Sequence, residues 1–235
     1  MRLNNYENRH DLLIDWMLEE IPPGSSFLDI GANDGSFCPE VSRVANHAGM
    51  FAGVDPDVAK LDRHPLLECR YPSTLEQAKF GDKSFDCLYA IYVLEHVSNP
   101  CGFLAAASRA LKPGGSLFFI TPNGYHYFAF IAGLLAKLGV QDRVLNVIRP
   151  KALVDQYHYP ATYRLNSPRR LRRLGLEYGF NRCEFRYSEN LAEFDCYFPG
   201  VLKVFPAFWE YMVQLTGQEF LLGNLMGRMI RSGTD

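Results

Sequence analysis

A glycine-rich loop and a later carboxylate are the residues of this sequence best suited to chemistry. Gly31 and Gly35 lack side chains that would keep a ligand away from the backbone, and Asn33 is among the few other residues that tolerate a left-handed conformation. Asp55 follows about 20 residues later, at a place from which a carboxylate accepts hydrogen bonds from ribose hydroxyls. The loop and the acid together predict a pocket for a nucleoside.

Three elements must position these residues. The apolar run from Phe27 to Ile30 has the length expected of a strand buried on both faces of a parallel sheet. A second short strand, residues 52–54, ends directly before Asp55. A helix that begins near Ser36 would point its unpaired N–H groups and its positive dipole end at the loop, which favours a bound carboxylate.

The spacing of the loop separates this pocket from that of a nicotinamide dehydrogenase. The fingerprint of those enzymes is G-x-G-x-x-G, which, counted from Gly31, requires glycine where this sequence has Asn33 and Ser36. The pattern present is D-x-G-x-N-x-G, from Asp29 to Gly35.

This pattern resembles the D-x-G-x-G-x-G loop of class I S-adenosylmethionine (SAM)-dependent methyltransferases, with the middle glycine replaced. Two later segments, Ser84 to Val97 and Leu111 to Asn123, resemble the fourth and fifth strand motifs of the same family, in its small-molecule type that includes quinone and secondary-metabolite enzymes. The resemblance implies an α/β fold with a Rossmann-like, doubly wound, seven-stranded sheet, mostly parallel with an antiparallel last strand. It also implies SAM as the methyl donor.

The resemblance further implies which residues contact the donor. Asp29 and the loop would line the methionine end, and Asp55 would bind the ribose. Pro56 and Asp57 would flank the adenine. The residues assigned in this way are Asp29, Gly31, Ala32, Asn33, Gly35, Asp55, Pro56, Ala90, Ile91 and Tyr92. Thr74 and Leu75 occupy the place where many relatives carry an acidic residue for the adenine amino group, so adenine recognition is expected to use backbone groups and apolar packing.

Three histidines are candidates for a catalytic base. Methyl transfer from a sulfonium ion is an in-line displacement, so positioning supplies most of the catalysis, and a base is needed only when the acceptor holds its proton. His96, after the fourth strand, is the first candidate, and His126 and His158 are the second. The alternatives are that His96 caps the following helix and that the other two pack beside tyrosines. Glu95 and His96 are too few ligands to predict a metal site.

The chain is expected to be a single domain, residues 1–235, with a core and two inserts. The core comprises residues 10–123, 167–189 and 224–231, and the inserts, residues 125–166 and 190–223, are predicted to be lids or parts of an acceptor pocket. Within the core, the expected helices lie at residues 10–20, from a Ser98 cap to Arg109, and from Ser167-Pro168 to Gly179. The expected late strands are residues 182–187 and 224–231.

Composition excludes some classes of partner. The net charge is −2 and the sequence pI is near 6.3, so the chain has no overall positive electrostatic potential that would attract nucleic acid. The D/N-P-P-Y/F motif of nucleic-acid amino-methyltransferases is also missing, because residues 90–93 read Ala-Ile-Tyr-Val. The six cysteines form no C-x-x-C pair, and no apolar run reaches the ~18 residues of a membrane span, so a cytoplasmic location is expected.

The expected function is therefore transfer of a methyl group from SAM to a small molecule, with an oxygen atom as the nucleophile. The expected acceptor is a natural product or a quinone-like, sugar or lipid-linked compound. The alternatives are methylation of nitrogen or carbon, and a SAM-binding scaffold without chemistry, which Asn33 and the missing acid near Thr74 keep open. The aromatic inserts could contact a membrane surface at its periphery, or pack on each other as an acceptor pocket or a dimer contact, so the chain is expected to be a monomer or a homodimer.

Overall fold

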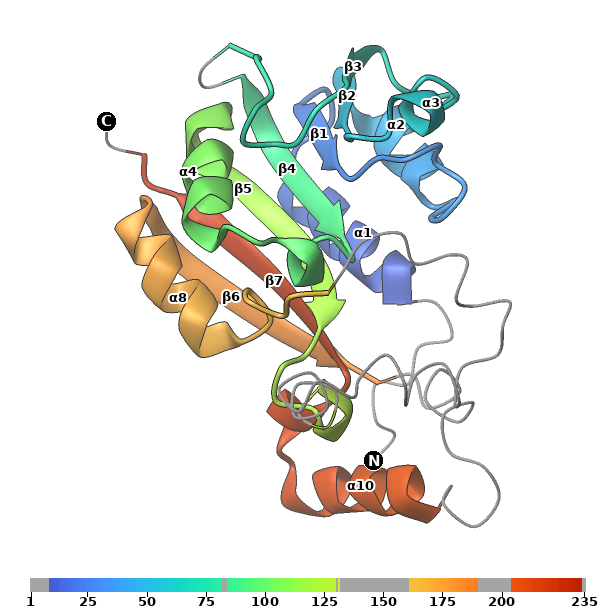
Figure 1. Ribbon diagram of the computed structural model, residues 1–235, viewed down its shortest axis with the longest axis vertical. Coiled ribbons are helices and arrows are strands. Elements are labelled where there is room, and N and C mark those ends of the chain that lie inside the picture. Colours follow the sequence, from blue (N-terminus) through green and yellow to red (C-terminus); the bar gives the residue numbers. More distant parts are fainter. Residues whose placement is uncertain (1–8, 82–83, 130, 132–160, 190–203, 234–235) are drawn as a thin grey trace.

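A single seven-stranded sheet organises the chain, and its strand order is β3-β2-β1-β4-β5-β7-β6 (Figure 1). The computed structural model describes residues 9–81, 84–129, 131, 161–189 and 204–233. Strands β1 to β5 pair in parallel, and β7 runs antiparallel to both of its neighbours, β5 and β6. The strands are β1 (Ser26–Ile30), β2 (Met50–Val54), β3 (Cys69–Tyr71), β4 (Phe85–Ile91), β5 (Leu111–Pro122), β6 (Phe180–Ser188) and β7 (Asn224–Arg231). The predicted sheet, with its antiparallel last strand, is confirmed.

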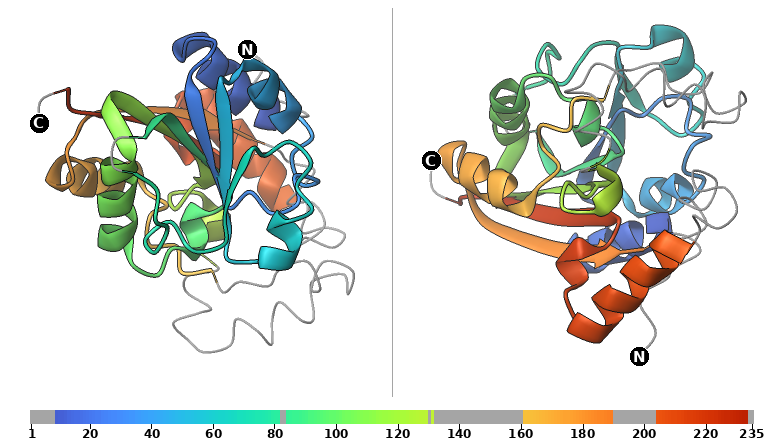
Figure 2. Two further views of the ribbon diagram at one scale, coloured as in Figure 1. Left: turned by 90° about the horizontal axis from the view of Figure 1, so that it is seen from above. Right: turned by 60° about the horizontal axis from the view of Figure 1, so that its bottom comes forward.

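Helices cover both faces of this sheet, as the doubly wound layout requires (Figures 1 and 2). One face packs against α1 (Arg9–Glu20), α2 (Val41–His47) and the short α3 (Val58–Leu61). The other face packs against α4 (Pro100–Ala110) and α8 (Pro168–Glu177). The sheet therefore has two hydrophobic cores, one on each side.

Alternation along the central strands divides the side chains between these cores. In β1 all five residues are buried, with Phe27 on the α1 face and Leu28 and Ile30 on the α4 face. On the α1 face, Trp16 meets Phe118 edge to face, with ring centroids 5.4 Å apart. The short apolar runs of the sequence are therefore strands that have no solvent face.

Two helix starts differ from the sequence prediction. Helix α2 begins at Val41 rather than near Ser36, because Pro39 disfavours a helical conformation at the preceding residue, and the Asp34 carboxylate holds Ser36 in a local turn through the Ser36 N–H. Helix α4 is capped by Asn99 rather than by Ser98, since the Asn99 side chain accepts a hydrogen bond from the Gly102 N–H at 3.1 Å. The loop after β1 is consequently longer than predicted and has no helix end directly behind it.

The later elements lie where the sequence places them. Helix α8 begins at Pro168 behind Ser167, and Gly179 follows it with a φ of 84°. Strands β6 and β7 contain the two predicted late strands. Among the described helices, none has the length and apolar character needed to cross a membrane.

Only parts of the two inserts belong to the described residues. In the first insert, residues 127–129 and 131 are helical. The second insert contributes α10 (Val204–Thr216) and the 3-10 turn η3 (Glu219–Leu221), which lie below the end of β5 in Figure 1. Phe208, Tyr211 and Leu215 of α10 are exposed. The division into core and inserts and the membrane contact stay predictions.

A glycine in β7 is fixed by the neighbouring strand. Gly227 pairs with Phe119 of β5, and a Cβ atom at Gly227 would lie 2.1 Å from the Phe119 ring. The ring therefore occupies the space that a side chain would fill, which explains a glycine in the interior of a strand.

Gly227→Ala should lower the free energy of unfolding by about 1–3 kcal/mol, because the buried Phe119 ring must leave its position. Urea unfolding measures this loss, and Gly233→Ala is the control, because a Cβ at Gly233 has no atom within 4 Å. Equal stability of the two variants would contradict the packing role.

Candidate functional site

The loop after β1 has the left-handed backbone that its residue types predict. The φ angles are 79° at Gly31, 51° at Asn33 and 76° at Gly35. The Gly31 N–H donates to the Val54 carbonyl at 2.8 Å, which attaches the start of the loop to the end of β2. The loop therefore turns at the carboxyl ends of the parallel strands, where ligands of this fold class bind.

Asp55 joins the loop to the next strand. Its Oδ2 accepts a hydrogen bond from the Asn33 N–H at 2.9 Å, and its Oδ1 accepts one from the Asp57 N–H at 2.7 Å. Burial raises the pKa of this carboxyl, and the two amide hydrogen bonds oppose the rise. A carboxylate offers about four lone-pair sites, so the side chain can hold both amides and still accept hydrogen bonds from a ligand.

Asp29 is the second buried acid of the loop region. It is 6% exposed, and the Tyr89 hydroxyl donates a hydrogen bond to its Oδ2 at 2.7 Å. Burial raises its pKa to about 7, the Tyr89 hydrogen bond opposes this rise, and the charge of Asp55 adds to it. Sequence reasoning missed Tyr89, although the two residues are register partners in the adjacent strands β1 and β4.

The glycines of the loop pack against protein atoms. A Cβ at Gly31 would lie 2.6 Å from Val93 Cγ2, and a Cβ at Gly35 would lie 2.7 Å from His64 Nε2. The expectation that these positions are bare to admit a ligand is therefore incomplete. Glycine is required there by the left-handed backbone and by close packing of the loop on its neighbours.

The remaining residues assigned to the donor fall into two groups. Ala32 and Ala90 are buried, and Pro56 and Thr74 are exposed. Leu75 is also buried, but it belongs to the core on the α4 face, so its side chain packs with the core. Neither side chain is acidic, so any ligand contact at Thr74 or Leu75 would use backbone groups or apolar surface.

The end of β4 carries an unusual backbone conformation. Tyr92, which follows the half-buried Ile91, has a φ of 55°, a left-handed conformation that is costly for a bulky residue and that often accompanies turns and functional sites. The Tyr92 N–H donates to the Ile120 carbonyl at 2.9 Å, and its hydroxyl donates to Asn224 Oδ1 at 2.9 Å. Tyr92 therefore links β4 to β5 and β7 at the edge of the sheet that holds the loop.

His96 lies on the same edge. It ends the 3-10 turn η1 (Leu94–His96) and is half-buried, and its backbone N–H donates to the Val93 carbonyl at 2.9 Å. The adjacent Glu95 is 5% exposed and accepts a hydrogen bond from the Thr121 hydroxyl at 3.0 Å. Burial raises the pKa of Glu95 to about 7.

His126 lies apart from this group, beside the second insert. Its Nε2 is 3.6 Å from Glu189 Oε2, and both side chains are 2% exposed. Burial lowers the pKa of His126 to about 3, so the imidazole is neutral at neutral pH. Glu189 also accepts a hydrogen bond from the Gly223 N–H at 3.1 Å, which fixes the pair against the entry to β7. His158 lies outside the described residues.

An open cavity of about 410 Å³ lies between the end of β5 and α10. Its lining is almost entirely aromatic or aliphatic. Two of the lining residues, Tyr125 and Tyr127, are the sequence neighbours of His126. The lining residues are Gly124, Tyr125, Tyr127, Trp209, Phe220 and Leu221. A cavity of this kind suits an apolar, ring-bearing small molecule.

Comparison with known proteins gives a consistent result. A family model described as a methyltransferase domain matches residues 4–183. A demethylmenaquinone methyltransferase of Tropheryma whipplei is 29% identical over 151 residues, covering 58% of this chain and 62% of the relative. A ubiquinone biosynthesis O-methyltransferase of Hahella chejuensis is 35% identical over 108 residues, covering 43% of this chain and 44% of the relative. The matches therefore span less than two thirds of the length of these relatives.

Solved structures share the fold. A phosphoethanolamine N-methyltransferase 2 of Haemonchus contortus, in complex with phosphomonomethylethanolamine and S-adenosylhomocysteine, aligns with a TM-score of 0.59 and 15% identity. The alignment covers 97% of this chain and 53% of that one. At this identity the likeness shows the fold alone.

Asp29→Asn should change the pH dependence of stability. The pKa of Asp29 rises from 3.8 to about 7 on folding. The contribution of the protonated carboxyl to the free energy of unfolding is therefore fully present below pH 3.8 and is lost as the pH rises through about 7. Asparagine has no proton to lose and keeps an acceptor for Tyr89. Urea unfolding at several pH values should therefore show that the stability of the variant, relative to that of the parent, increases between pH 3.8 and about 7.

The control for this experiment is Asp62→Asn, at the exposed end of α3. This variant measures what the loss of an exposed carboxylate elsewhere in the chain does to the same stability curve. A pH-independent difference for Asp29→Asn would contradict the raised pKa.

Proposed function

The chain belongs to the methyltransferase domain family, and from that membership we propose that it binds SAM and transfers the methyl group to a small molecule. The acceptor atom in this proposal is a hydroxyl oxygen on an apolar, ring-bearing compound. The products are the methyl ether and S-adenosylhomocysteine, and the hydroxyl proton leaves to a base.

One observation carries the proposal: the left-handed loop from Gly31 to Gly35 is joined directly to Asp55 through the Asn33 amide. This arrangement sets backbone groups and a carboxylate beside each other at the carboxyl ends of β1 and β2. The remaining lone pairs of Asp55 can accept the two ribose hydroxyls, while the loop backbone faces the methionine end. Asp29, Gly31, Ala32, Asn33, Gly35, Asp55, Pro56, Thr74, Leu75, Ala90, Ile91 and Tyr92 remain the residues proposed to contact the donor.

The cavity beneath β5 supports the choice of acceptor. Its aromatic walls, among them Tyr127 and Trp209, would stack on a flat ring and exclude water from the reacting atoms. The name of the ubiquinone biosynthesis O-methyltransferase supports an oxygen acceptor, and that of the demethylmenaquinone methyltransferase supports a quinone-type ring. In-line displacement then depends on holding the hydroxyl oxygen, the methyl carbon and the sulfur in a row.

His96 is the base that we propose. It is half-buried, and it follows β4 at the edge of the sheet where the donor would lie. His126 is less suited to accept a proton, because its pKa of about 3 is far from neutral. His126 would instead position the cavity wall, since its ring lies 4.1 Å from that of Tyr127.

Asp55→Ala should weaken binding of S-adenosylhomocysteine by ~1.5–3 kcal/mol, the range for a lost hydrogen bond to a charged group. Isothermal titration calorimetry measures the affinity, and circular dichroism checks that the sheet is intact. Asp62→Asn, on the exposed end of α3, should bind as the parent does. Parental affinity in folded Asp55→Ala would refute the ribose role.

His96→Ala should lower kcat at saturating SAM by ~100-fold or more, because a positioned base contributes at least this much. The assay follows transfer of a labelled methyl group to a panel of quinols and phenols, and the pH profile should lose the limb that belongs to the base. His47→Ala is the matched control, since His47 ends α2 and contacts the Ile21 carbonyl at the opposite edge of the sheet. A small loss with an unchanged pH profile would show that His96 only positions the turn.

A further inference from the structure

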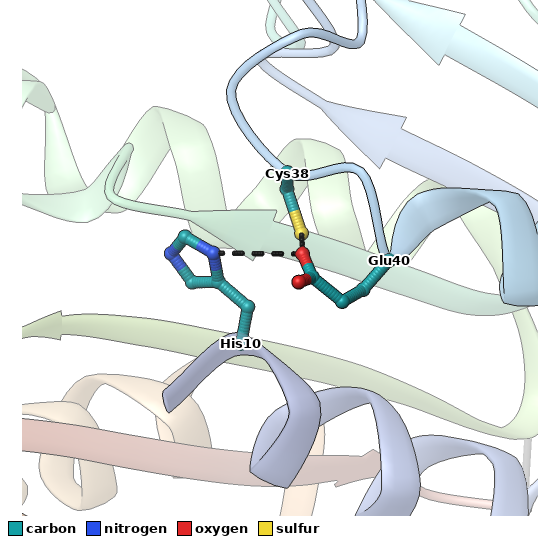
Figure 3. Close-up of side chains that lie close together, drawn as sticks. All are labelled: His10, Cys38 and Glu40. Atoms are coloured by element: carbon teal, nitrogen blue, oxygen red, sulfur yellow. Dashed lines mark hydrogen bonds and ion pairs between the residues drawn. The ribbon is translucent and has the colours of Figure 1, made fainter. Parts of the chain in front are cut away.

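Three side chains of metal-binding type meet beside the loop but take no part in the proposed reaction. His10 lies on the first turn of α1, and Cys38 and Glu40 belong to the segment between the loop and α2 (Figure 3). Cys38 Sγ is 3.3 Å from Glu40 Oε2, and the same oxygen is 3.9 Å from His10 Nδ1. The ligand atoms all lie within 4.8 Å of one another.

We infer that His10, Cys38 and Glu40 form a zinc site. Zinc binds Cys sulfur at about 2.3 Å and His nitrogen or carboxylate oxygen at about 2.0–2.2 Å, so tetrahedral angles separate neighbouring ligand atoms by about 3.4–3.6 Å. The two separations around Glu40 Oε2, 3.3 and 3.9 Å, lie close to these values. Among the residues that the structure describes, this is the grouping of three ligands that geometry supports.

The donor set also fits zinc in charge. One thiolate and one carboxylate neutralise a divalent cation, and a neutral imidazole adds no charge, so the loaded site is neutral. Neutrality matters because Cys38 is only 4% exposed, and the His10 and Glu40 side chains are 14% and 19% exposed. Sulfur and nitrogen ligands together select zinc over magnesium or calcium, which prefer oxygen.

One of the three side chains must lose a proton before it can bind zinc. Burial and the charge of Arg9 lower the pKa of His10, which keeps the imidazole in its ligating form. Burial raises the pKa of the Cys38 thiol far above its usual range, and the S–H donates to Glu40. Zinc binding forms the S–Zn bond and releases the thiol proton to solvent.

The position of the site gives it a structural effect. The His10 ring centroid is 5.5 Å from that of Phe37 and 6.0 Å from that of Tyr92, so the cluster lies between α1, the loop and the end of β4. A bound zinc would tie the start of α1 to the segment that follows the loop. Three protein ligands leave a fourth position for water. The site does not depend on methyl transfer, so either proposal can fail without the other.

The test is metal binding by the purified full chain after removal of metals with a chelator. The parent should bind a single zinc ion in competition with a chromophoric chelator, and zinc should raise its melting temperature. Cobalt(II) should give the thiolate charge-transfer absorption. His10→Ala, Cys38→Ser and Glu40→Gln should each weaken zinc binding at least about 100-fold, since even loss of a group behind the ligands costs about 10- to 100-fold.

Cys69→Ser is the matched control, because Cys69 is an exposed cysteine on the edge strand β3. It should keep the zinc affinity and the cobalt absorption of the parent. No saturable zinc binding by the parent, or parental affinity in folded His10→Ala and Glu40→Gln, would overturn the site and leave a cluster that only packs. If Cys38→Ser does not fold, His10→Ala and Glu40→Gln still test the site.

Discussion

The Asp55 carboxylate accepts two backbone hydrogen bonds, one from Asn33 in the loop after β1 and one from Asp57 in the turn before α3. These bonds hold two chain segments at fixed positions over the ends of adjacent strands. Because each involves a charged acceptor, each is worth about 1.5–3 kcal/mol when the site is buried. A nucleoside that approaches this edge meets a preformed carboxylate and a preformed loop, and the ordering cost of the site falls on folding rather than on binding.

The rest of the site depends on this arrangement through a small number of packed contacts. Val93 and His64 lie against the two glycines of the loop, so the loop cannot move without moving the end of β4 or the segment after α3. Tyr92 then connects the end of β4 to Asn224 at the start of β7. The proposed donor site, the turn that carries His96 and the aromatic cavity are thus joined through the carboxyl ends of neighbouring strands.

Much of the fold was predictable from the sequence because its signals are local. Short apolar runs predict strands buried on both faces, and the glycines and Asn33 predict the left-handed loop. The longer loop before α2 differs from the predicted helix start, because Pro39 disfavours a helical conformation at Cys38. Some contacts depend on strand register or on segments that are far apart in the chain. The contact of Tyr89 with Asp29 and the proximity of His10 to Cys38 are of this kind, and no local sequence pattern predicts them. Gly227 weakens the strand prediction for its segment, and only the position of the Phe119 ring explains why glycine is present there.

The loop held by the Asp55 carboxylate is proposed to bind a sulfonium nucleoside. Equilibrium dialysis of the folded chain against labelled SAM measures this retention most directly. The account predicts saturable retention of one donor per chain that S-adenosylhomocysteine displaces and that adenosine alone displaces far less well, since both ends of the molecule are held. Absence of saturable retention by folded protein would contradict it.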